Sequence, residues 1–402
     1  MKQREERPET AAVHAGKLQI PANPASSPAL FQASSYEFSD LDDVEAVYGG
    51  ARAGKIYGRY GGPNGSQFEA AMTELEGAEE AAAASAGMSA IDAALGSALA
   101  GKRRSILATA ECYGGTYSLL EHDYRGSGCA VEYVDQQDLA AVRTALERTR
   151  PAVLYLEALT NPLIHVADLP ALAALGHEAG AVVIVDATFA TPMLFRPVEH
   201  GADLVVHSVG KYLGGHGDVG AGLIAGKANL VRGARDLLTR KGGTIPHFEA
   251  WLAVRGLRTL GLRMLRHSSN AVAVATYLSG RDDVERVHHP SRPDHPQHAL
   301  AKRLYPSGTG GMIAFDLRGG RRDVDRFLRG LQTIAIVHSL GEVATTASYP
   351  AVSSHRMLPE DARRELGVTD GTVRISVGIE HPEDIVRDLE RAFAGLGERV
   401  RA

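Results

Sequence analysis

Cysteine is scarce in this sequence of 402 residues: Cys112 and Cys129 are the only two, and they form no CxxC pair. A disulfide-stapled small domain, a thiolate zinc site and a redox dithiol are therefore not indicated. The sequence also lacks an uncharged apolar run of about 18 residues, so we expect no membrane-spanning helix. Its charged first ten residues have no apolar core of the kind that a signal peptide needs. We therefore expect a cytoplasmic protein with no membrane partner.

An excess of basic residues is also missing. Lysine plus arginine number 43 against 48 acidic residues, which gives a formal net charge of -5. Nucleic acid is therefore not expected as a main partner. What is present is an ordinary globular composition, 44% hydrophobic and 23% charged, with enough apolar mass to bury a sizeable core. The length suggests about two or three domains.

The first 56 residues carry no periodic apolar pattern. Pro21, Pro24 and Pro28, together with paired serines, interrupt any regular helix or strand. This segment predicts an extended N-terminal arm over residues 1–56, of the kind that lies on a partner subunit in a large enzyme.

From about residue 66 short apolar runs alternate with segments of helical periodicity. Helices are predicted at 66–78, 138–149 and 168–179. Strands are predicted at 105–109, 130–134, 152–156, 181–186, 203–207 and 220–225. Near-continuous apolar strands separated by helices indicate a mostly parallel sheet that is covered on both faces and joined by right-handed crossovers. We therefore expect an α/β large domain over residues 57–256.

The alternation of short apolar strands and helices ends at about residue 256. One long helix is predicted at 257–279, and a Pro/His-rich loop follows it at 288–298. Further strands are predicted at 312–317 and 373–377, with helices at 322–330 and 383–395. This pattern predicts a smaller α+β domain over residues 257–402.

Lys211 stands in a glycine-rich turn directly after an apolar strand, three residues beyond Ser208. Burial at the strand end would desolvate this lysine, lower its pKa and make its amine nucleophilic. The alternative is an ordinary surface lysine in a loop. Asp186 ends another buried strand, where α/β sheets place ligand groups, although an aspartate there could equally cap a helix.

A third feature is the segment 85–91, where Gly87 and Ser89 precede a helical run. Backbone N–H groups at such a helix start favour a phosphate, and the alternative is a simple capped helix. A Schiff-base lysine, an acid for a pyridinium nitrogen and a phosphate cup together describe the binding site of pyridoxal 5'-phosphate (PLP).

The sequence resembles the Cys/Met-metabolism family of PLP enzymes over nearly its whole length. The motifs that carry the resemblance occur in the family's order: YGRYGGPN (57–64), SAGMSAI (85–91), YGGTY (113–117), EALTNP (157–162), VDATFATP (185–192), HSVGKYLGGHGD (207–218), WLAVRGLRTLGLRM (251–264), SLGEV (339–343) and VRISVGIE (373–380). The resemblance implies the PLP fold type I, with a mostly parallel seven-stranded sheet in the large domain and a smaller α+β C-terminal domain.

The resemblance also implies catalytic roles. Lys211 would form the Schiff base with PLP and carry protons between the cofactor, Cα and Cβ. Asp186 would keep the pyridine nitrogen protonated. Tyr113 would stack on the ring and act as acid or base near the leaving group. The other cofactor contacts that it implies are Gly87, Met88, Asn161, Thr188 and Ser208, with Tyr57 and Arg59 reaching the phosphate of the neighbouring subunit.

On the substrate side, Arg374 would bind the α-carboxylate through its guanidinium fork, and Asn161 would lie beside it. Ser339 would orient the lysine. His338 stands where family members differ; it could hydrogen-bond a polar substituent or move a proton, and the alternative is a packed histidine without a substrate role. The cross-subunit contacts imply an obligate dimer. Because the family usually forms a dimer of dimers, the resemblance also implies a tetramer.

Several positions depart from the family pattern. Gly62 replaces an asparagine, Asn64 a threonine, and Ala187 an asparagine; Ala344 stands where glutamate is common. Gly210 replaces a threonine that donates to the phosphate, and a lost bond of this kind is worth about 1.5–3 kcal/mol. We therefore expect weaker cofactor binding with the chemistry retained.

Two further positions bear on ligands. Gly115 stands where methionine γ-lyases carry a reactive cysteine, which weakens methionine as the main substrate. The segment 288–298 contains His288, His289, Asp294, His295 and His298. Similar segments are normal in the family between the long helix and the small domain, so no metal is expected.

The leading expectation is γ-elimination from a homoserine-type or sulfur-containing L-amino acid such as cystathionine, with release of a 2-oxo acid and ammonia. Gamma-replacement by a nucleophile is the close alternative, since the same residues serve both, and a specialised biosynthetic role is compatible with either. A catalytically silent PLP-fold binding protein is the third reading, motivated by the departures at 62, 187 and 210.

Overall fold

The computed structural model describes residues 7–15, 26–101 and 103–397. Its largest element is a seven-stranded sheet in the order β1-β7-β6-β5-β4-β2-β3. The strands are β1 Glu80–Ala84, β2 Ser105–Thr109, β3 Ala130–Val134, β4 Val153–Glu157, β5 Val182–Asp186, β6 Leu204–Ser208 and β7 Gly222–Gly226. The contiguous block from β6 to β3 is parallel, which confirms the predicted mostly parallel sheet.

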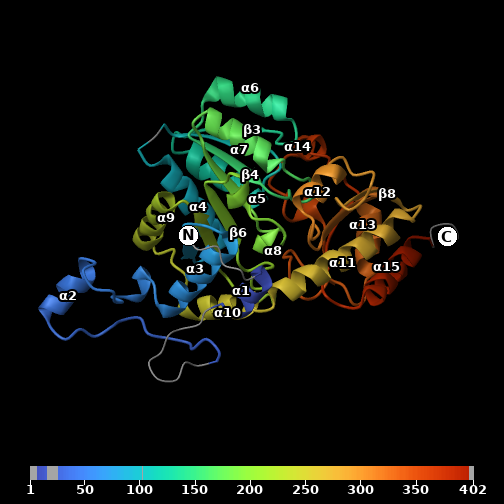
Figure 1. Cartoon of the computed structure of the whole chain (residues 1–402). Helices are drawn as coiled ribbons and strands as arrows, with labels where there is room; N and C mark the ends of the chain where they lie inside the picture. The colour runs from blue at the N-terminus through green and yellow to red at the C-terminus, as the bar shows by residue number, and fades with distance from the viewer. Residues whose placement is uncertain (1–6, 16–25, 102, 398–402) are drawn as a thin grey trace.

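Alternate residues of the central strands enter two different hydrophobic cores. In β4, Leu154 and Leu156 pack in the core formed with the helices over residues 63–76, 139–149, 169–178 and 247–257. Val153 and Tyr155 pack in the core formed with the helices over residues 87–99 and 228–241. Because both faces are covered, β4 is wholly buried and reads as a near-continuous apolar run. Figure 1 shows these helices on the two sides of the sheet.

The helices of this part of the chain pack on both faces of the seven-stranded sheet. Their bounds are α3 Pro63–Glu76, α4 Gly87–Leu99, α5 Gly114–Ser118, α6 Leu139–Thr149, α7 Leu169–Glu178, α8 Thr191–Leu194, α9 Ala228–Lys241 and α10 His247–Leu257. Asp138 caps α6 by accepting from the N–H groups of Ala140 and Ala141, so α6 begins one residue later than predicted.

The second sheet has five strands in the order β10-β11-β12-β9-β8. These are β8 Val284–His288, β9 Met312–Leu317, β10 Ala335–Ile336, β11 Thr346–Ser348 and β12 Thr372–Ser376. Their apolar face packs with helices α11 Leu260–Ser279, α13 Gly320–Gly330 and α15 Pro382–Gly397. Two short helices, α12 His298–Leu304 and α14 Glu360–Glu365, also belong to this half of the chain.

The single helix predicted at 257–279 is wrong at its start. The chain forms α10 and then α11, with Thr259 in a non-helical conformation before Leu260. Helix α11 runs from the large sheet toward the small one (Figure 1). The domain boundary between residues 256 and 257 thus falls at the end of α10, and it stays a prediction.

The predicted arm contains two helices that its sequence pattern did not indicate, α1 Pro8–Val13 and α2 Leu41–Tyr48. Helix α1 packs against α3 and α11. Pro21 and Pro24, on which the prediction partly rested, lie outside the described residues. The segment that carries α2 projects away from the sheet (Figure 1).

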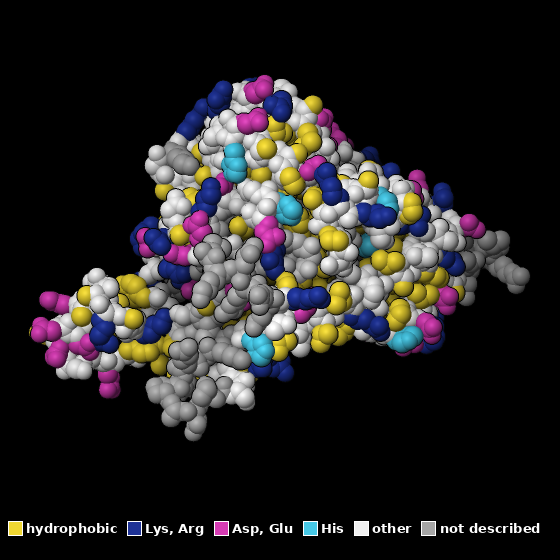
Figure 2. Space-filling model, viewed as in Figure 1, with side chains coloured by type: hydrophobic (Ala, Val, Ile, Leu, Met, Phe, Trp, Pro, Cys, Tyr) yellow, Lys and Arg dark blue, Asp and Glu magenta, His cyan; other side chains and the backbone are white. Residues whose placement is uncertain are grey.

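Basic and acidic side chains intermingle on the face shown in Figure 2. This face therefore offers no continuous basic surface of the kind that nucleic acids need. Among the described residues, no helix is long and apolar enough to cross a membrane.

Candidate active site

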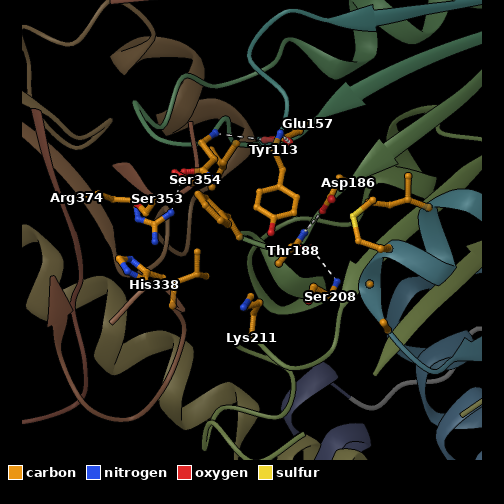
Figure 3. A pocket seen from close by; sticks show the side chains of 18 of the residues that line it. Tyr113, Glu157, Asp186, Thr188, Ser208, Lys211, His338, Ser353, Ser354 and Arg374 are labelled. Atoms are coloured by element: carbon orange, nitrogen blue, oxygen red, sulfur yellow. Dashed lines mark hydrogen bonds between the residues drawn. The ribbon is translucent and has the colours of Figure 1, made fainter. Parts of the chain in front are cut away.

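A cavity of about 480 Å³ opens at the carboxyl ends of β4, β5 and β6, where the small sheet faces the large one. Parallel strands of an open α/β sheet place ligand groups at this edge. Its lining residues are Ala86, Gly87, Met88, Ile91, Tyr113, Glu157, Leu159, Asn161, Asp186, Thr188, Phe189, Ser208, Lys211, His338, Leu340, Val352, Ser353, Ser354, Arg356 and Arg374. In Figure 3, Asp186, Thr188 and Ser208 lie on one side, and Arg374 and His338 on the other.

Lys211 lies in the turn after β6 and points into this cavity (Figure 3). Its ammonium Nζ donates to Oγ of Ser339 at 3.0 Å. Burial lowers the pKa of Lys211 and the positive charge of Arg374 lowers it further, whereas Glu342 raises it. The structure thus brings Lys211 and Ser339 together as the sequence predicted, and the amine is more readily neutral than that of a surface lysine.

Asp186 ends β5 inside the cavity. Its Oδ1 accepts the N–H of Thr188 at 2.9 Å, and Tyr155 Oη lies 3.5 Å from Oδ2. Burial raises the pKa of Asp186, while its hydrogen bonds with Thr188 oppose the rise. A half-buried carboxylate of this kind is best satisfied by a cationic N–H donor, which is what a protonated pyridine nitrogen offers.

Glu157 is a site residue that the sequence analysis missed. It ends β4 directly beside Asp186, and its two carboxylate oxygens accept the N–H groups of Tyr113 at 2.6 Å and Asn161 at 3.3 Å. Burial raises the pKa of Glu157 well above its usual range, and the nearby Asp186 adds to the rise. Glu157 therefore fixes the backbone of two predicted site residues. The argument that singled out Asp186, an acid at a strand's carboxyl end, applies equally to Glu157 and could have found it.

The start of α4 supplies N–H groups for an anion. Ala86 precedes the helix in extended conformation, and no side chain caps it. An ideal Cβ on Gly87 would lie only 2.9 Å from Cβ of Ser208, so glycine is needed for the close approach of the two segments. The N–H of Ser208 in turn donates to Oγ1 of Thr188 at 2.9 Å. Gly87, Met88, Thr188 and Ser208 are thus brought to one end of the cavity, as predicted.

Arg374 on β12 meets Asn161 across the two sheets. Its Nη1 donates to Oδ1 of Asn161 at 3.0 Å and its Nη2 to the carbonyl of Ser339 at 3.4 Å. The Nε of Arg374 is buried and has no hydrogen-bond partner among the described residues. Burial lowers the pKa of Arg374 to about 10. An arginine with an unused donor in a cavity is suited to a carboxylate ligand.

The departures from the family pattern have local structural explanations. An ideal Cβ on Gly210 would lie 2.4 Å from the carbonyl oxygen of Val219, so a side chain there would require a backbone shift. The imidazole of His247 fills the space beside Gly62, where Cε1 would lie 2.1 Å from an added Cβ. Asn64 is fully buried and holds the arm through the carbonyl of Ala29 and the N–H of Phe31.

The other two departures are simpler. Ala187 is buried and donates its N–H to the carbonyl of Val206, and Ala344 is exposed. Gly115 lies against the predicted acid–base residue, because an added Cβ would lie 2.5 Å from Cε1 of Tyr113. A cysteine at this position would therefore displace the Tyr113 ring.

Two predicted cofactor residues do not line this cavity. Tyr57 is 48% exposed, and Arg59 donates to the carbonyl of Thr239 at 3.1 Å. His338 does line the cavity, with an exposed side chain, and its contact with substrate stays a prediction.

Ser353, Ser354 and Arg356 also line the cavity and were missed, because no sequence pattern marks this irregular turn. The histidines of segment 288–298 have other partners: His288 pairs with Asp316 and His289 with Ser291. Across the described ranges, no group of three or more His, Cys, Asp and Glu residues is arranged to hold a metal ion.

A family model described as Cys/Met metabolism PLP-dependent enzyme matches residues 9–394. The chain belongs to this family. The resemblance drawn from the motifs is therefore confirmed, and PLP is the cofactor of the enzyme class to which this chain belongs.

Several named proteins are similar over nearly the whole chain. An O-succinylhomoserine sulfhydrylase from Pseudomonas aeruginosa is 38% identical, with 96% of this chain and 95% of that protein covered. An L-methionine gamma-lyase from Pseudomonas putida is 37% identical, with 96% of each chain covered. The solved structure of a cystathionine gamma synthase from Xanthomonas oryzae is 33% identical, with a TM-score of 0.91 over 98% of this chain and all of that one. The chain is thus similar both to a lyase and to enzymes that form a new bond.

The residues present fit PLP. An amine with lowered pKa on Lys211, a half-buried carboxylate on Asp186 and uncapped N–H groups at the start of α4 all face one cavity. These groups match the aldehyde, the ring nitrogen and the phosphate of the cofactor respectively.

Proposed function

We propose that this protein cleaves the bond between the γ-carbon and a sulfur or oxygen substituent of a homoserine-type L-amino acid such as cystathionine. The observation that carries the proposal is the meeting of Lys211 and Arg374 in one cavity, from the two sheets of the molecule. Arg374 can hold the α-carboxylate while Lys211 reaches the α- and β-carbons. A binding protein would have no need of a desolvated amine beside a carboxylate-binding guanidinium, which argues against the silent reading.

Bound PLP would supply the electron sink that makes the protons on Cα and Cβ removable. The neutral amine of Lys211 would accept the Cα proton and then move a proton at Cβ. Asp186 would hold the proton on the ring nitrogen. The hydroxyl of Tyr113 would give a proton to the departing substituent, and hydrolysis would leave 2-oxobutyrate and ammonia.

Gamma-replacement is the second candidate, and a specific observation favours it. The relative from Pseudomonas aeruginosa is a sulfhydrylase, and it matches the chain about as well as the methionine gamma-lyase does. In this reaction a thiol adds to the γ-carbon after the substituent leaves. The same Lys211 and Tyr113 then return the protons.

The two reactions separate in one assay. PLP-loaded protein would be incubated with cystathionine, methionine or O-acyl-L-homoserines, each with and without an added thiol, and the products measured by mass spectrometry. Formation of 2-oxobutyrate without thiol supports elimination, and a thioether formed only with thiol supports replacement. Survival of every substrate would contradict both.

We also propose a homodimer with shared active sites, two of which form a tetramer. Tyr57 and Arg59 are exposed and lie outside the cavity of their own chain. Leu41 and Tyr48, on the projecting arm that precedes them, are 81% and 59% exposed. Such apolar exposure suits a subunit contact. Light scattering would test the assembly, and a monomer with full activity would contradict it.

We propose a cytoplasmic location as well, in keeping with two free, buried cysteines, Cys112 and Cys129. Fractionation of cells followed by detection of the protein tests this. Recovery from an extracytoplasmic compartment would contradict it.

A further inference from the structure

The acidic and basic groups of the cavity are separated in space. Among the described residues that line it, the carboxylates are Glu157 and Asp186, and both stand at strand ends of the large sheet. Each accepts at least one backbone N–H. The opposite wall, from the small-sheet part, contributes Arg374, Arg356 and His338. That wall therefore offers positive charge with no carboxylate among its described lining residues.

Arg356 is the second guanidinium of this wall, and it is not committed to another group. Its side chain is exposed, and no ion pair or side-chain hydrogen bond is recorded for it within residues 7–15, 26–101 and 103–397. Arg363 and Arg364, in the helical segment that follows, do have partners: Arg363 donates to the carbonyl of Leu358, and Arg364 pairs with Glu360. Arg356 can thus bind a ligand without breaking a described contact.

The turn that carries Arg356 lies on the Tyr113 side of the cavity. Gly114 directly follows Tyr113, and the carbonyl oxygen of Ser354 packs against it. A Cβ added to Gly114 would lie only 2.1 Å from that oxygen. Ser354 and Tyr113 are labelled side by side in Figure 3. In the proposed reaction Tyr113 faces the departing substituent. Arg356, two residues beyond Ser354, lines the same cavity. Because Arg374 is assigned to the α-carboxylate, the part of the substrate left for Arg356 is the γ-substituent.

We propose that Arg356 determines specificity by binding a second anionic group carried on the γ-substituent, either a carboxylate or a phosphate. This inference rests on the proposed function, because it assigns the α-carboxylate to Arg374. A guanidinium pairs with either anion through two parallel N–H donors. The neighbouring hydroxyls are already engaged, that of Ser353 with the carbonyl of Tyr349 and that of Ser354 with Nδ1 of His355, so the guanidinium is the group of this turn that is left for the anion.

The test compares three substrates that differ in the charge of the γ-substituent: O-succinyl-, O-phospho- and O-acetyl-L-homoserine. Each is assayed with and without thiol on the PLP-loaded wild type, on Arg356→Gln and on Arg356→Lys. Arg322→Gln, which removes an exposed arginine from α13, is the matched control.

Arg356→Gln should lower kcat/KM for one or both anionic esters about ten-fold or more, because a charge-assisted bond is lost. The neutral acetyl ester should change less than about two-fold, which also shows that the variant is folded. Arg356→Lys should keep part of the preference, and the control all of it. The ester that responds identifies carboxylate or phosphate as the recognised group. Equal losses for all three esters, or none for either anionic ester, would overturn the inference.

A binding measurement separates this inference from the proposed function. Lys211→Ala, loaded with PLP, should bind the esters without turning them over, and calorimetry gives the dissociation constants. Adding Arg356→Gln should weaken binding of the responsive anionic ester about ten-fold relative to the acetyl ester. If wild type turns over no ester but this difference appears, the proposed reaction fails, while the binding of an anionic substituent by Arg356 is supported. If the difference is absent, the inference fails whatever the turnover.

Discussion

The two walls of the cavity are built differently. On the large-sheet wall, Asp186 and Glu157 are buried or nearly so, and each is fixed by backbone N–H donors. On the small-sheet wall, His338 and Arg356 are exposed, with no recorded side-chain hydrogen bond in the part of the chain that the structure describes. Groups that take part in bond breaking need fixed geometry. Groups on an exposed turn can differ between relatives without disturbing it. We therefore propose that the first wall sets the chemistry and the second the choice of substrate.

Arg374 is the exception that joins the walls. It belongs to the small sheet, yet it is buried and bonded to Asn161 and Ser339. This agrees with its proposed task, since every L-amino-acid substrate carries the same α-carboxylate. The comparison therefore predicts large, substrate-independent effects on the fixed groups and small, substrate-dependent effects on the exposed ones.

The largest effect should follow Lys211→Ala. This variant lacks the amine that is proposed to accept and move protons even when PLP is bound, so turnover of every substrate should fall by at least about 10³-fold. Lys302→Ala, on the exposed surface of α12, serves as the control and should leave the rate unchanged. Steady-state assays with two substrates check this. Retention of full activity by Lys211→Ala would exclude the assigned lysine.

Tyr113→Phe should come second. The ring is kept and only the hydroxyl is lost, so kcat should fall about 10²-fold while PLP is still bound. Tyr117→Phe, a tyrosine beside Tyr133 and outside the cavity lining, is the control. Pre-steady-state release of the leaving group measures the affected step. A Tyr113→Phe enzyme with wild-type kcat for every substrate would show that the hydroxyl moves no proton.

Arg374→Lys should raise KM about 10–100-fold, with a smaller change in kcat, because a lysine cannot form the two-pronged bond to a carboxylate. The rise should be similar for all amino-acid substrates. Amine analogues that lack the α-carboxylate are the control, and their binding should be almost unchanged. A KM effect limited to one substrate would move Arg374 to the specificity side of the comparison.

Acid should lower the stability of the protein through buried histidines in the C-terminal half of the chain. Burial lowers the pKa of His267, His289 and His355 to about 4. Between about pH 6.5 and 4 the unfolded chain takes up protons that these folded histidines refuse, so the free energy of unfolding should fall as the pH falls through this window. Each histidine should contribute on the order of 1–3 kcal/mol of this loss.

Denaturant unfolding at pH 7, 6 and 5 measures the slope. His355→Asn should flatten it, whereas His122→Gln, at an exposed position, should not. Equal slopes in His355→Asn and wild type would show that His355 is not held neutral by the fold.

The smallest effect should follow His338→Gln. Its exposed side chain lines the cavity without a described partner, so kcat/KM should change less than about ten-fold and unequally between substrates. The ratio of kcat/KM for two substrates with different γ-substituents is the quantity to measure. An unchanged ratio would mean that the histidine is packed at the rim with no substrate contact.

Sequence patterns predicted the parts of the fold whose burial is uniform. Strand β4 and its neighbours were found because both faces are covered. Strand β1 was missed because its alanine-rich sequence carries little strand propensity. The break between α10 and α11 was missed because Arg258 and Thr259 interrupt the helical pattern without glycine or proline.

The site residues also fall into those that a local sequence pattern predicts and those that it does not. Lys211 and Asp186 follow apolar strands, so their position at the sheet edge could be predicted. Arg356 and Ser354 belong to an irregular turn, and Ser354 packs on Gly114, a residue more than 200 positions away in the sequence. No local pattern encodes such a contact.

The central claim is that the large-sheet wall holds PLP on Lys211. The direct test is reduction of PLP-loaded protein with borohydride, followed by peptide mapping by mass spectrometry. We predict a pyridoxyl adduct on the peptide that contains Lys211, together with bleaching of the visible absorption band. An adduct on Lys55, the other described lysine whose pKa burial lowers, or no adduct on any lysine, would contradict the account.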